Sequence, residues 1–448
     1  MRWAMRDGRS SKLSRRNRGT MRILLVTSSL PWPTHGGGNQ RTNLLHRSLS
    51  ERGQVDTVMI SRYGKVASEK WQDVVSGFGG KFVYEERLAE HRAPWRWAGH
   101  LSGSLPHRLT HMIWGWGCDF MPDRMVASQL RSMVEKENYD IIVGRYMWAL
   151  ARSGVMGMRP TLLDVDDFET DVIEANLEAR QPKGLQRKWI ERRYRQVARI
   201  ERKILDACDH AWVAKAGDIK RVGHDRSSIL PNIPFVKAGQ AGVQPCPPNS
   251  ESKNILMVGT LEHPVNTRAI EGFLAGPWRQ IVEQVPDAKF HIVGSGMTEE
   301  MRNRWGSVVG VRPIGFAEDL RQAYSDAAFT IVPIHEGGGT KIKVLESMLY
   351  GRCCVCAPHS LRGYEHVLEN ERSIIVADDA PALVDRCVSL LNDPAKRLAI
   401  AQEGERQVRK HFSVQHFMDT VLCAVDNVIG GQQTRGETGG NSSFLAAS

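Results

Sequence analysis

Two series of short apolar runs, separated by stretches with helical periodicity, most constrain what this chain can fold into. The first series lies between residues 22 and 215, and the second lies between residues 254 and 377. Parallel strands need a crossover between them, and that crossover is usually a helix. We therefore expect an α/β chain with two doubly wound, Rossmann-like domains that face each other across a cleft. The expected strands are 22–28, 55–60, 139–144, 160–168 and 210–215, then 254–260, 288–296, 311–316, 329–334, 352–358 and 373–377.

The stretch between the two series marks the domain boundary. Residues 235–253 mix Gly, Pro and small polar residues without apolar periodicity, which is typical of a linker. The predicted domains are then 21–234 and 254–429, the second with closing helices. We expect two disordered ends, a basic leader over 1–20 and a Gly-rich polar tail over 430–448.

Composition limits the possible locations and partners. Hydrophobic residues make up 41% of the 448 residues and charged residues 25%, as in ordinary globular proteins. No stretch approaches the roughly 18 uninterrupted apolar residues that a membrane-spanning helix needs. Three of the eight cysteines, Cys353, Cys354 and Cys356, crowd one apolar run and are expected to be small buried hydrophobes rather than metal ligands. We expect a cytoplasmic protein with no metal site and no nucleic-acid partner.

Two segments could contact a membrane surface. Residues 91–120 contain four tryptophans among His and Arg side chains, a mixture that suits a membrane interface or a sugar-stacking surface. A strongly basic helix is expected from about residue 186 to 208, and with the basic leader it would suit peripheral contact with anionic lipid. The alternatives are a segment packed on the first domain and a solvated helix face.

Each domain has a glycine-rich loop between a predicted strand and a predicted helix. The first loop is PWPTHGGGNQRT, residues 31–42, and the second lies in PIHEGGGTKIKVLESMLYG, residues 333–351. Ligands of open parallel sheets bind at the carboxyl ends of strands. Glycines let backbone N–H groups approach a ligand, and the start of a helix adds partial positive charge, which suits phosphate. Neither loop fits the GxxxxGK[ST] pattern, so hydrolysis of a nucleoside triphosphate is disfavoured.

Charged residues sharpen the prediction for the second loop. Lys341 and Lys343 fall in the first turn of the expected helix, where each cation is unfavourable by about 0.3 to 1 kcal/mol. A bound polyanion would supply the missing partner.

The position of Glu346 follows from the apolar spacing of the same helix. Ile342, Leu345 and Leu349 should face the core, which puts Glu346 near the edge of the buried stripe. There it could bind a ribose diol, as acidic groups do in other nucleotide sites. A solvated helix carboxylate is the equal alternative.

With these motifs the chain resembles retaining glycosyltransferases of the GT-B type, similar to family 4. The resemblance covers most of residues 21–417, and in the first half it rests on the loop region 21–53 and on PNI at 231–233. In the second half it rests on MVGTLEHPVNTRAIEGF, FHIVGSG, VRPIGFAEDLRQAYSDAAFTIVPI and GGGTKIKVLESMLYGRCCVCAP. It implies transfer of a sugar from a nucleoside diphosphate to a hydroxyl of a glycan or lipid-linked acceptor, in cell-surface polysaccharide or glycolipid synthesis. No cofactor is implied, because the nucleotide sugar is a substrate.

The resemblance also implies roles for particular residues. The pyrophosphate would lie near the second glycine loop, with Lys341 and Lys343 stabilising the leaving group, and the ribose would lie near Glu346. The first glycine loop would close over the reacting end of the donor. The substrate-binding candidates are Gly36, Gly37, Gly38, Gly259, Thr260, Phe316, Glu336, Gly337, Gly338, Gly339, Thr340 and Glu346.

The second half departs from the family pattern at two places. The family commonly has two glutamates eight positions apart, but Gly338 lies eight residues before Glu346, and Glu336 lies ten before it. Thr260 stands where a phosphate-binding arginine is usual, and the expected lysine is also absent. Lys341, Lys343 or Arg268 would then supply the positive charge.

The first half departs in LLDVDDF. Many relatives have a histidine after this strand that contacts the reacting sugar, and here Asp166 takes that place. Asp164, Asp166 and Asp167 also resemble a metal-binding DxD motif, but we favour a contact of Asp166 with the donor sugar or the acceptor. An ordinary turn at the end of a strand is the equal alternative.

Two other function classes fit the same architecture. One is a non-catalytic sugar-nucleotide-binding or scaffold protein that has lost the glutamate and the arginine. The other is a sugar-nucleotide epimerase or hydrolase, which would act without an acceptor. Turnover with and without acceptors distinguishes the three.

Overall fold

The computed structural model describes residues 20–31, 37–60, 82–84, 120, 122, 124–234 and 242–439. The basic leader, almost all of the tryptophan-rich segment and the end of the predicted tail lie outside the described residues. So does the first part of the predicted linker, whereas residues 242–253 form no helix or strand.

The first domain is built on a parallel seven-stranded sheet in the order β3-β2-β1-β4-β5-β6-β7. Strand order reverses between β1 and β4, the place where doubly wound sheets bind ligands. All five predicted strands are confirmed, and the short β3 and β7 are additions. The strands are β1 (Met21–Thr27), β2 (Gly53–Met59), β3 (Phe82–Tyr84), β4 (Ile141–Arg145), β5 (Thr161–Asp166), β6 (His210–Val213) and β7 (Ser227–Ile229).

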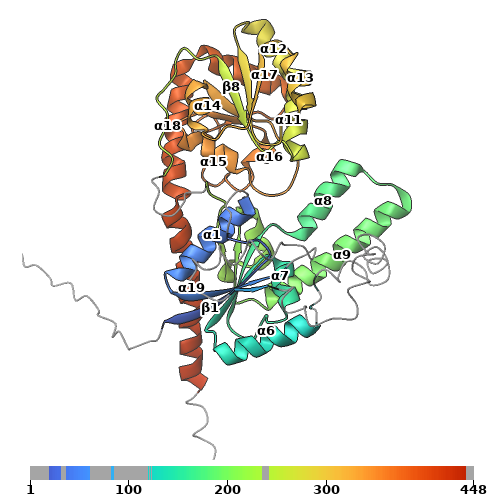
Figure 1. Ribbon diagram of the computed structural model, residues 1–448, viewed down its shortest axis with the longest axis vertical. Coiled ribbons are helices and arrows are strands. Elements are labelled where there is room, and N and C mark those ends of the chain that lie inside the picture. Colours follow the sequence, from blue (N-terminus) through green and yellow to red (C-terminus); the bar gives the residue numbers. More distant parts are fainter. Residues whose placement is uncertain are drawn as a thin grey trace, which may run out of the picture.

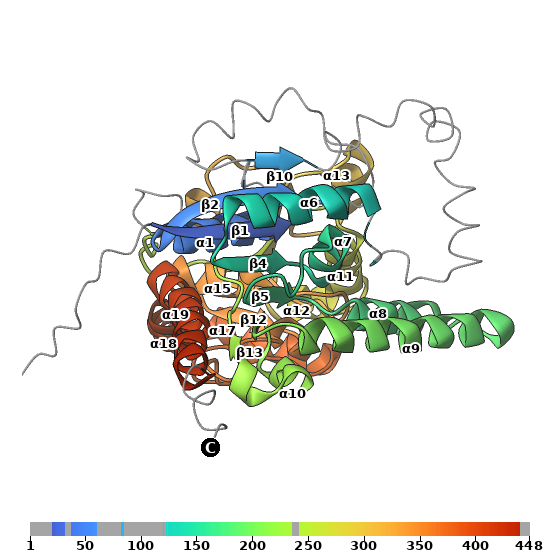
Figure 2. The ribbon, with the colours of Figure 1, turned by 90° about the horizontal axis from the view of Figure 1, so that it is seen from below.

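Helices cover both faces of this sheet, and two of them extend far beyond it (Figure 2). The predicted basic helix is α9, which with α8 forms a hairpin that leaves the sheet after β5. The helices of this domain are α1 (Gly37–Ser50), α6 (Arg124–Glu137), α7 (Met147–Ser153), α8 (Glu169–Arg180), α9 (Gly184–Asp206) and α10 (Ile219–Val222).

The second domain repeats the design on a parallel six-stranded sheet in the order β10-β9-β8-β11-β12-β13. All six predicted strands are confirmed: β8 (Asn254–Val258), β9 (Lys289–Val293), β10 (Val311–Gly315), β11 (Phe329–Val332), β12 (Cys354–Cys356) and β13 (Ile375–Val376). The helices are α11 (Pro264–Ala275), α12 (Pro277–Gln284), α13 (Glu299–Gly306), α14 (Arg321–Asp326), α15 (Ile342–Leu349), α16 (Pro358–Leu361), α17 (Ala380–Asn392) and α18 (Pro394–His411). Cys353, Cys354 and Cys356 are free and buried, as predicted.

The last helix joins the two domains. α19 (Val414–Gly439) leaves the second domain and runs along the first, where it packs against α1 (Figure 1). Phe417 and Val421 of α19 share a buried cluster with Leu45 of α1 and Leu345 of α15. α19 ends ten residues beyond the expected boundary at 429, so the start of the predicted tail is helical. It belongs with the first domain in space, although it follows the second in sequence.

Across the described part of the chain, no helix combines the length and the apolar character that crossing a bilayer requires.

Candidate active site

The second glycine loop lies at the carboxyl end of a strand, as predicted, and the strand order of the second sheet reverses there. It follows β11, which pairs directly with β8, and it ends at the start of α15. Gly337 and Gly339 have φ of 92° and 69°. A residue with a side chain would be strained in this backbone conformation, whereas glycine adopts it freely. Nε2 of His359 lies 2.7 Å from the carbonyl oxygen of Gly337 and fixes the loop from α16. No sequence motif singles out this histidine.

Both predicted lysines lie at this loop. Nζ of Lys343 donates to Oδ1 of Asn266 at 2.7 Å, and a Cβ at Gly259 would lie 2.5 Å from the same Nζ. Gly259 therefore provides the space into which Lys343 reaches. Nζ of Lys341 donates to the carbonyl of Gly338 at 2.8 Å. Lys343 thus places positive charge beside the loop after β8, where the family arginine is missing.

Burial changes the acidity of the charged groups on α15. Burial, and to a lesser degree the nearby Lys341, lower the pKa of Lys343 to about 8, although Glu346 acts in the opposite direction. Burial raises the pKa of Glu346 above its usual value, although Lys343 and a hydrogen bond with Tyr324 oppose that change. Glu346 is therefore buried beside Lys343 and Tyr324 and is not a solvated carboxylate. Tyr324 in turn stacks on Tyr350 with ring centroids 4.1 Å apart.

The other predicted donor contacts of the second domain are spread along the carboxyl edge of the sheet. Thr260 is exposed after β8, and its carbonyl accepts a hydrogen bond from Asn266. Phe316 is 73% exposed after β10, which lies three strands from β11, or about 14 Å across the sheet. Glu336 forms an ion pair with Arg268 of α11 at the start of the glycine loop. Arg268, one of the three cations considered as a replacement for the missing family groups, is therefore already paired with a carboxylate.

The first glycine loop opens α1 and meets α15. A Cβ at Gly37 would lie 3.8 Å from Cδ1 of Ile342, so the starts of the two helices adjoin. Ile342 is only partly buried at this contact, contrary to the expectation that it faces the core, whereas Leu345 and Leu349 enter the core as predicted. A Cβ at Gly38 would lie 3.0 Å from the hydroxyl of Tyr146. Gly36 lies outside the described residues.

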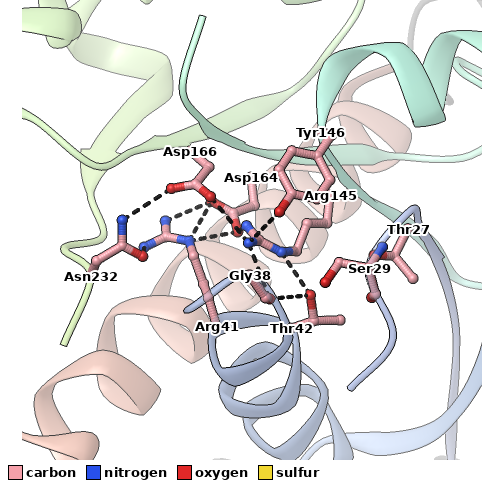
Figure 3. A network of polar contacts seen from close by, with 10 residues as sticks. All are labelled: Thr27, Ser29, Gly38, Arg41, Thr42, Arg145, Tyr146, Asp164, Asp166 and Asn232. Carbon is pink, nitrogen blue, oxygen red and sulfur yellow. Dashed lines mark hydrogen bonds and ion pairs between the residues drawn. The ribbon is translucent and has the colours of Figure 1, made fainter. Parts of the chain in front are cut away.

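Asp164 and Asp166 belong to a buried network of four charges that the sequence analysis missed (Figure 3). Arg145, which is fully buried, donates to Oδ2 of Asp164 at 2.7 Å and to Oδ2 of Asp166 at 3.1 Å. Arg41 of α1 donates to both oxygens of Asp164. Two arginines therefore balance two carboxylates. The carboxylates of the DxD pattern are thus paired with arginines.

The geometry of Asp166 singles it out within this network. Its φ is 58°, and that of Tyr146 at the end of the neighbouring strand is 71°, a conformation that costs about 1 to 3 kcal/mol for such residues and is typical of functional sites. Burial alone would raise the pKa of Asp166, but Arg145, Arg41 and a hydrogen bond from Asn232 lower it to about 2. The side chain is 16% exposed. Asp166 is therefore a fixed, ionised acceptor.

Asp167, which the sequence analysis noted only as part of the DxD pattern, faces the second domain. Its Oδ2 would lie 3.3 Å from a Cβ at Gly339, and its Oδ1 pairs with Nζ of Lys215 at 2.9 Å. The hydroxyl of Tyr364 in the second domain donates to the carbonyl of Asn232 at 3.4 Å. The glycine loop, its lysines and the end of β5 therefore form one site at the junction of the domains.

Comparison with known proteins agrees with this arrangement. Residues 252–393 match the family model described as "Glycosyl transferases group 1". The chain is also similar to a phosphatidyl-myo-inositol mannosyltransferase from Mycolicibacterium smegmatis, with 26% identity over 204 residues. That alignment covers 43% of this chain and 52% of the relative, so the chain spans about half the length of the curated relative that it matches.

Solved structures extend the similarity to both domains. HepE from Anabaena, in complex with UDP and glucose, has a TM-score of 0.57 at 11% identity, over 91% of this chain and 100% of that one. Sucrose-phosphate synthase from Thermosynechococcus elongatus has a TM-score of 0.59 at 16% identity, over 94% and 100%. A mutant S. aureus TarM, in complex with Fondaparinux, alpha-GlcNAc-glycerol and UDP, has a TM-score of 0.57 at 9% identity, over 91% and 99%. Residues 252–393 therefore match a group 1 glycosyltransferase domain, and the chain as a whole has the two Rossmann-like domains of the GT-B fold.

Proposed function

We propose that this protein transfers a sugar from a nucleoside-diphosphate sugar to an acceptor hydroxyl with retention of the anomeric configuration. The observation that carries the proposal is the meeting of the glycine loop and Lys343 with the end of β5 at the domain junction. Gly339 lies beside Asp167, and Gly37 lies beside Ile342, so the start of α15 faces the first domain. A donor bound there would have its diphosphate on one domain and its sugar beside the other.

The chemistry that this arrangement supports is stabilisation of the leaving diphosphate. The negative charge that grows on the diphosphate would be met by backbone N–H groups of Gly337 to Gly339 and by the cations of Lys341 and Lys343. These groups are fixed before the reaction, so little reorganisation opposes bond breaking. Glu346 would accept hydrogen bonds from the ribose hydroxyls.

Asp166 is proposed to orient the transferred sugar or the acceptor. With a pKa of about 2 it stays ionised at neutral pH and does not carry a proton. A carboxylate has about four acceptor positions, and Arg145 and Asn232 occupy two of them. The remaining positions can accept hydrogen bonds from sugar hydroxyls. The acceptor hydroxyl would then attack from the face that the diphosphate leaves and pass its proton to an oxygen of the leaving diphosphate, which preserves the configuration.

The comparisons favour a glycan or lipid-linked acceptor in cell-surface synthesis. The similar mannosyltransferase is named for phosphatidyl-myo-inositol, and the TarM structure contains alpha-GlcNAc-glycerol with UDP. Both names describe those proteins. For this chain they support an acceptor that carries a hydroxyl on a lipid or a polymer.

The test is a panel of UDP-, GDP- and ADP-sugars with the full chain. We expect one nucleotide class to raise the melting temperature of the wild type, and Glu346→Gln to reduce that rise. With a mixture of membrane glycolipids as acceptors, sugar should appear in the lipid fraction. Binding without any turnover would instead support a non-catalytic sugar-nucleotide protein. Release or epimerisation of the sugar in the absence of acceptors would support a hydrolase or an epimerase.

The glycine loop gives a second prediction, with a matched control inside the same triplet. Gly337→Ala should weaken binding of the preferred nucleoside diphosphate about tenfold, because alanine is strained at φ 92° and its Cβ would meet Val265 at 3.2 Å. Gly338 lies outside the left-handed region, and a Cβ there would meet only Asp167 at 3.8 Å. Gly338→Ala should therefore stay within about twofold of the wild type. Titration calorimetry measures both, and equal losses would show that backbone shape at Gly337 does not matter for the site.

A further inference from the structure

The hairpin α8–α9 carries a surface that the proposed sugar transfer does not use. α9 is 23 residues long, or about 34 Å, and the views in Figures 1 and 2 both show the hairpin extending away from the first domain. Val197, Ile204 and Leu205 anchor the helix in the buried cluster of that domain. The opposite face of α9 is open to solvent.

That open face is a stripe of cations. Lys188, Arg192, Arg195, Arg199 and Lys203 are all exposed and follow one another at spacings of three or four residues, which places them on one side of the helix. Within the described residues none of the five has an acidic partner, whereas Arg187 and Arg202 of the same helix pair with Glu191 and Asp206. Like charges at these spacings destabilise a helix, so the stripe is unfavourable until an anionic partner covers it.

Two large apolar side chains continue the stripe at the tip of the hairpin. Leu185 is 85% exposed and Trp189 is 46% exposed, and their spacing to Arg192 puts them on the cationic face. With Val172 of α8, the hairpin holds three of the six large exposed hydrophobic residues found in the described part of the chain. Tryptophan and leucine beside lysine and arginine are typical of helices that lie in a membrane interface.

The length of the cationic stripe and the apolar residues at its end indicate what kind of partner it binds. From Leu185 to Lys203 it runs about 27 Å, too far for one small anion to neutralise. A nucleic acid would offer the charge but would leave the apolar tip without a function. A bilayer with anionic headgroups satisfies both, because its surface attracts the cations and its interface accepts the apolar side chains.

We propose that the exposed face of α9 docks this protein onto an anionic lipid surface, with Leu185 and Trp189 inserted at the headgroup level. α8 begins three residues after Asp166, so docking would hold the end of β5 near the bilayer. If the proposed transfer is correct, this position would bring a lipid-linked acceptor to the site.

The test is co-sedimentation of the full chain with vesicles of phosphatidylcholine, with and without phosphatidylglycerol. We expect binding only to the anionic vesicles, and weaker binding at higher salt. Lys188→Gln with Arg192→Gln should lower the partition coefficient about 30-fold, since each basic residue contributes about a factor of five near an anionic surface. Leu185→Ala with Trp189→Ala should also lower it. The matched control is Arg279→Gln with Arg312→Gln, which removes two exposed charges from the second domain and should have no effect.

Equal binding of the wild type and both hairpin variants would overturn the proposal, and so would equal binding to neutral vesicles. A hairpin variant that changes only the molar mass in light scattering, or only the affinity for RNA, would also overturn it, in favour of self-association or nucleic-acid binding. The vesicle assay needs neither donor nor acceptor, so it does not depend on the proposed transferase activity. Binding of UDP without vesicles should be the same in wild type and hairpin variants.

Discussion

Replacing Arg145 with methionine is expected to lower the free energy of unfolding of the first domain by about 3 to 5 kcal/mol. Arg145 is fully buried and donates to Asp164, Asp166 and Thr42. Its removal leaves two carboxylates with one arginine in a largely buried site, and an uncompensated buried charge is costly. Because the network joins α1, β4 and β5, the loss should be confined to the first domain.

Hydrogen exchange measured peptide by peptide gives the local free energy of opening and separates the two domains. Peptides from 124–234 should lose protection, and peptides from 254–393 should keep it. Arg279→Met, at an exposed arginine on α12, is the control and should change neither set. Adding Asp166→Asn to Arg145→Met should restore part of the loss, because it removes one of the uncompensated charges. A uniform loss over both domains, or no loss, would contradict the role assigned to the network.

The same network predicts the pH at which the loss develops. In the wild type the pKa of Asp166 is lowered from 3.8 to about 2, so its contribution is complete above pH 3.8 and disappears only as the pH falls through about 2. Without Arg145, one of the two arginines that lower the pKa of this carboxyl is gone while burial still raises it, so the pKa should rise. The folded variant should therefore keep a proton on Asp166 up to a higher pH than the folded wild type does.

The fold could be predicted from the sequence because its signal is local. Each buried parallel strand is a short run of Val, Ile and Leu, and each crossover is a helix with its own periodicity. β7 was missed because Ser227 and Ser228 give it no apolar run. The placement of α19 against α1 was missed because a helix's amphipathic pattern does not say which domain covers it.

The candidate site likewise has a part that could be predicted from the sequence and a part that could not. The glycine loop and Lys343 are neighbours in sequence, so their shared position at the start of α15 could be predicted. The network of Arg41, Arg145 and Asp166 comes from three separate elements, and only the tertiary fold brings them together. One sequence signal for this network was available. Arg145 directly follows a run of apolar residues in a strand, so it had to be either buried with an acidic partner or exposed at the carboxyl edge of the sheet.

Lys343→Ala is expected to lower kcat/KM for sugar transfer about 100- to 1,000-fold at neutral pH. That is the usual effect of removing one fixed donor that stabilises charge in a transition state. Nζ of Lys343 is held by Asn266 beside Gly259, at the position where the strand order reverses, whereas Nζ of Lys341 donates to the carbonyl of Gly338. Lys289→Ala is the matched control, because Lys289 is exposed at the start of β9, on the opposite edge of the sheet, and its loss should leave kcat/KM unchanged.

The pH profile tests the same residue by a second route. The pKa of Lys343 is lowered to about 8 in the free protein, and donor binding needs the protonated form. The diphosphate is already ionised above pH 7, so kcat/KM of the wild type should fall about tenfold for each pH unit above 8. Lys343→Arg should keep a measurable rate and lose this decline, because arginine remains protonated throughout the range. A decline that persists unchanged in Lys343→Arg would assign the titration to another group, and with it the stabilisation of the leaving diphosphate.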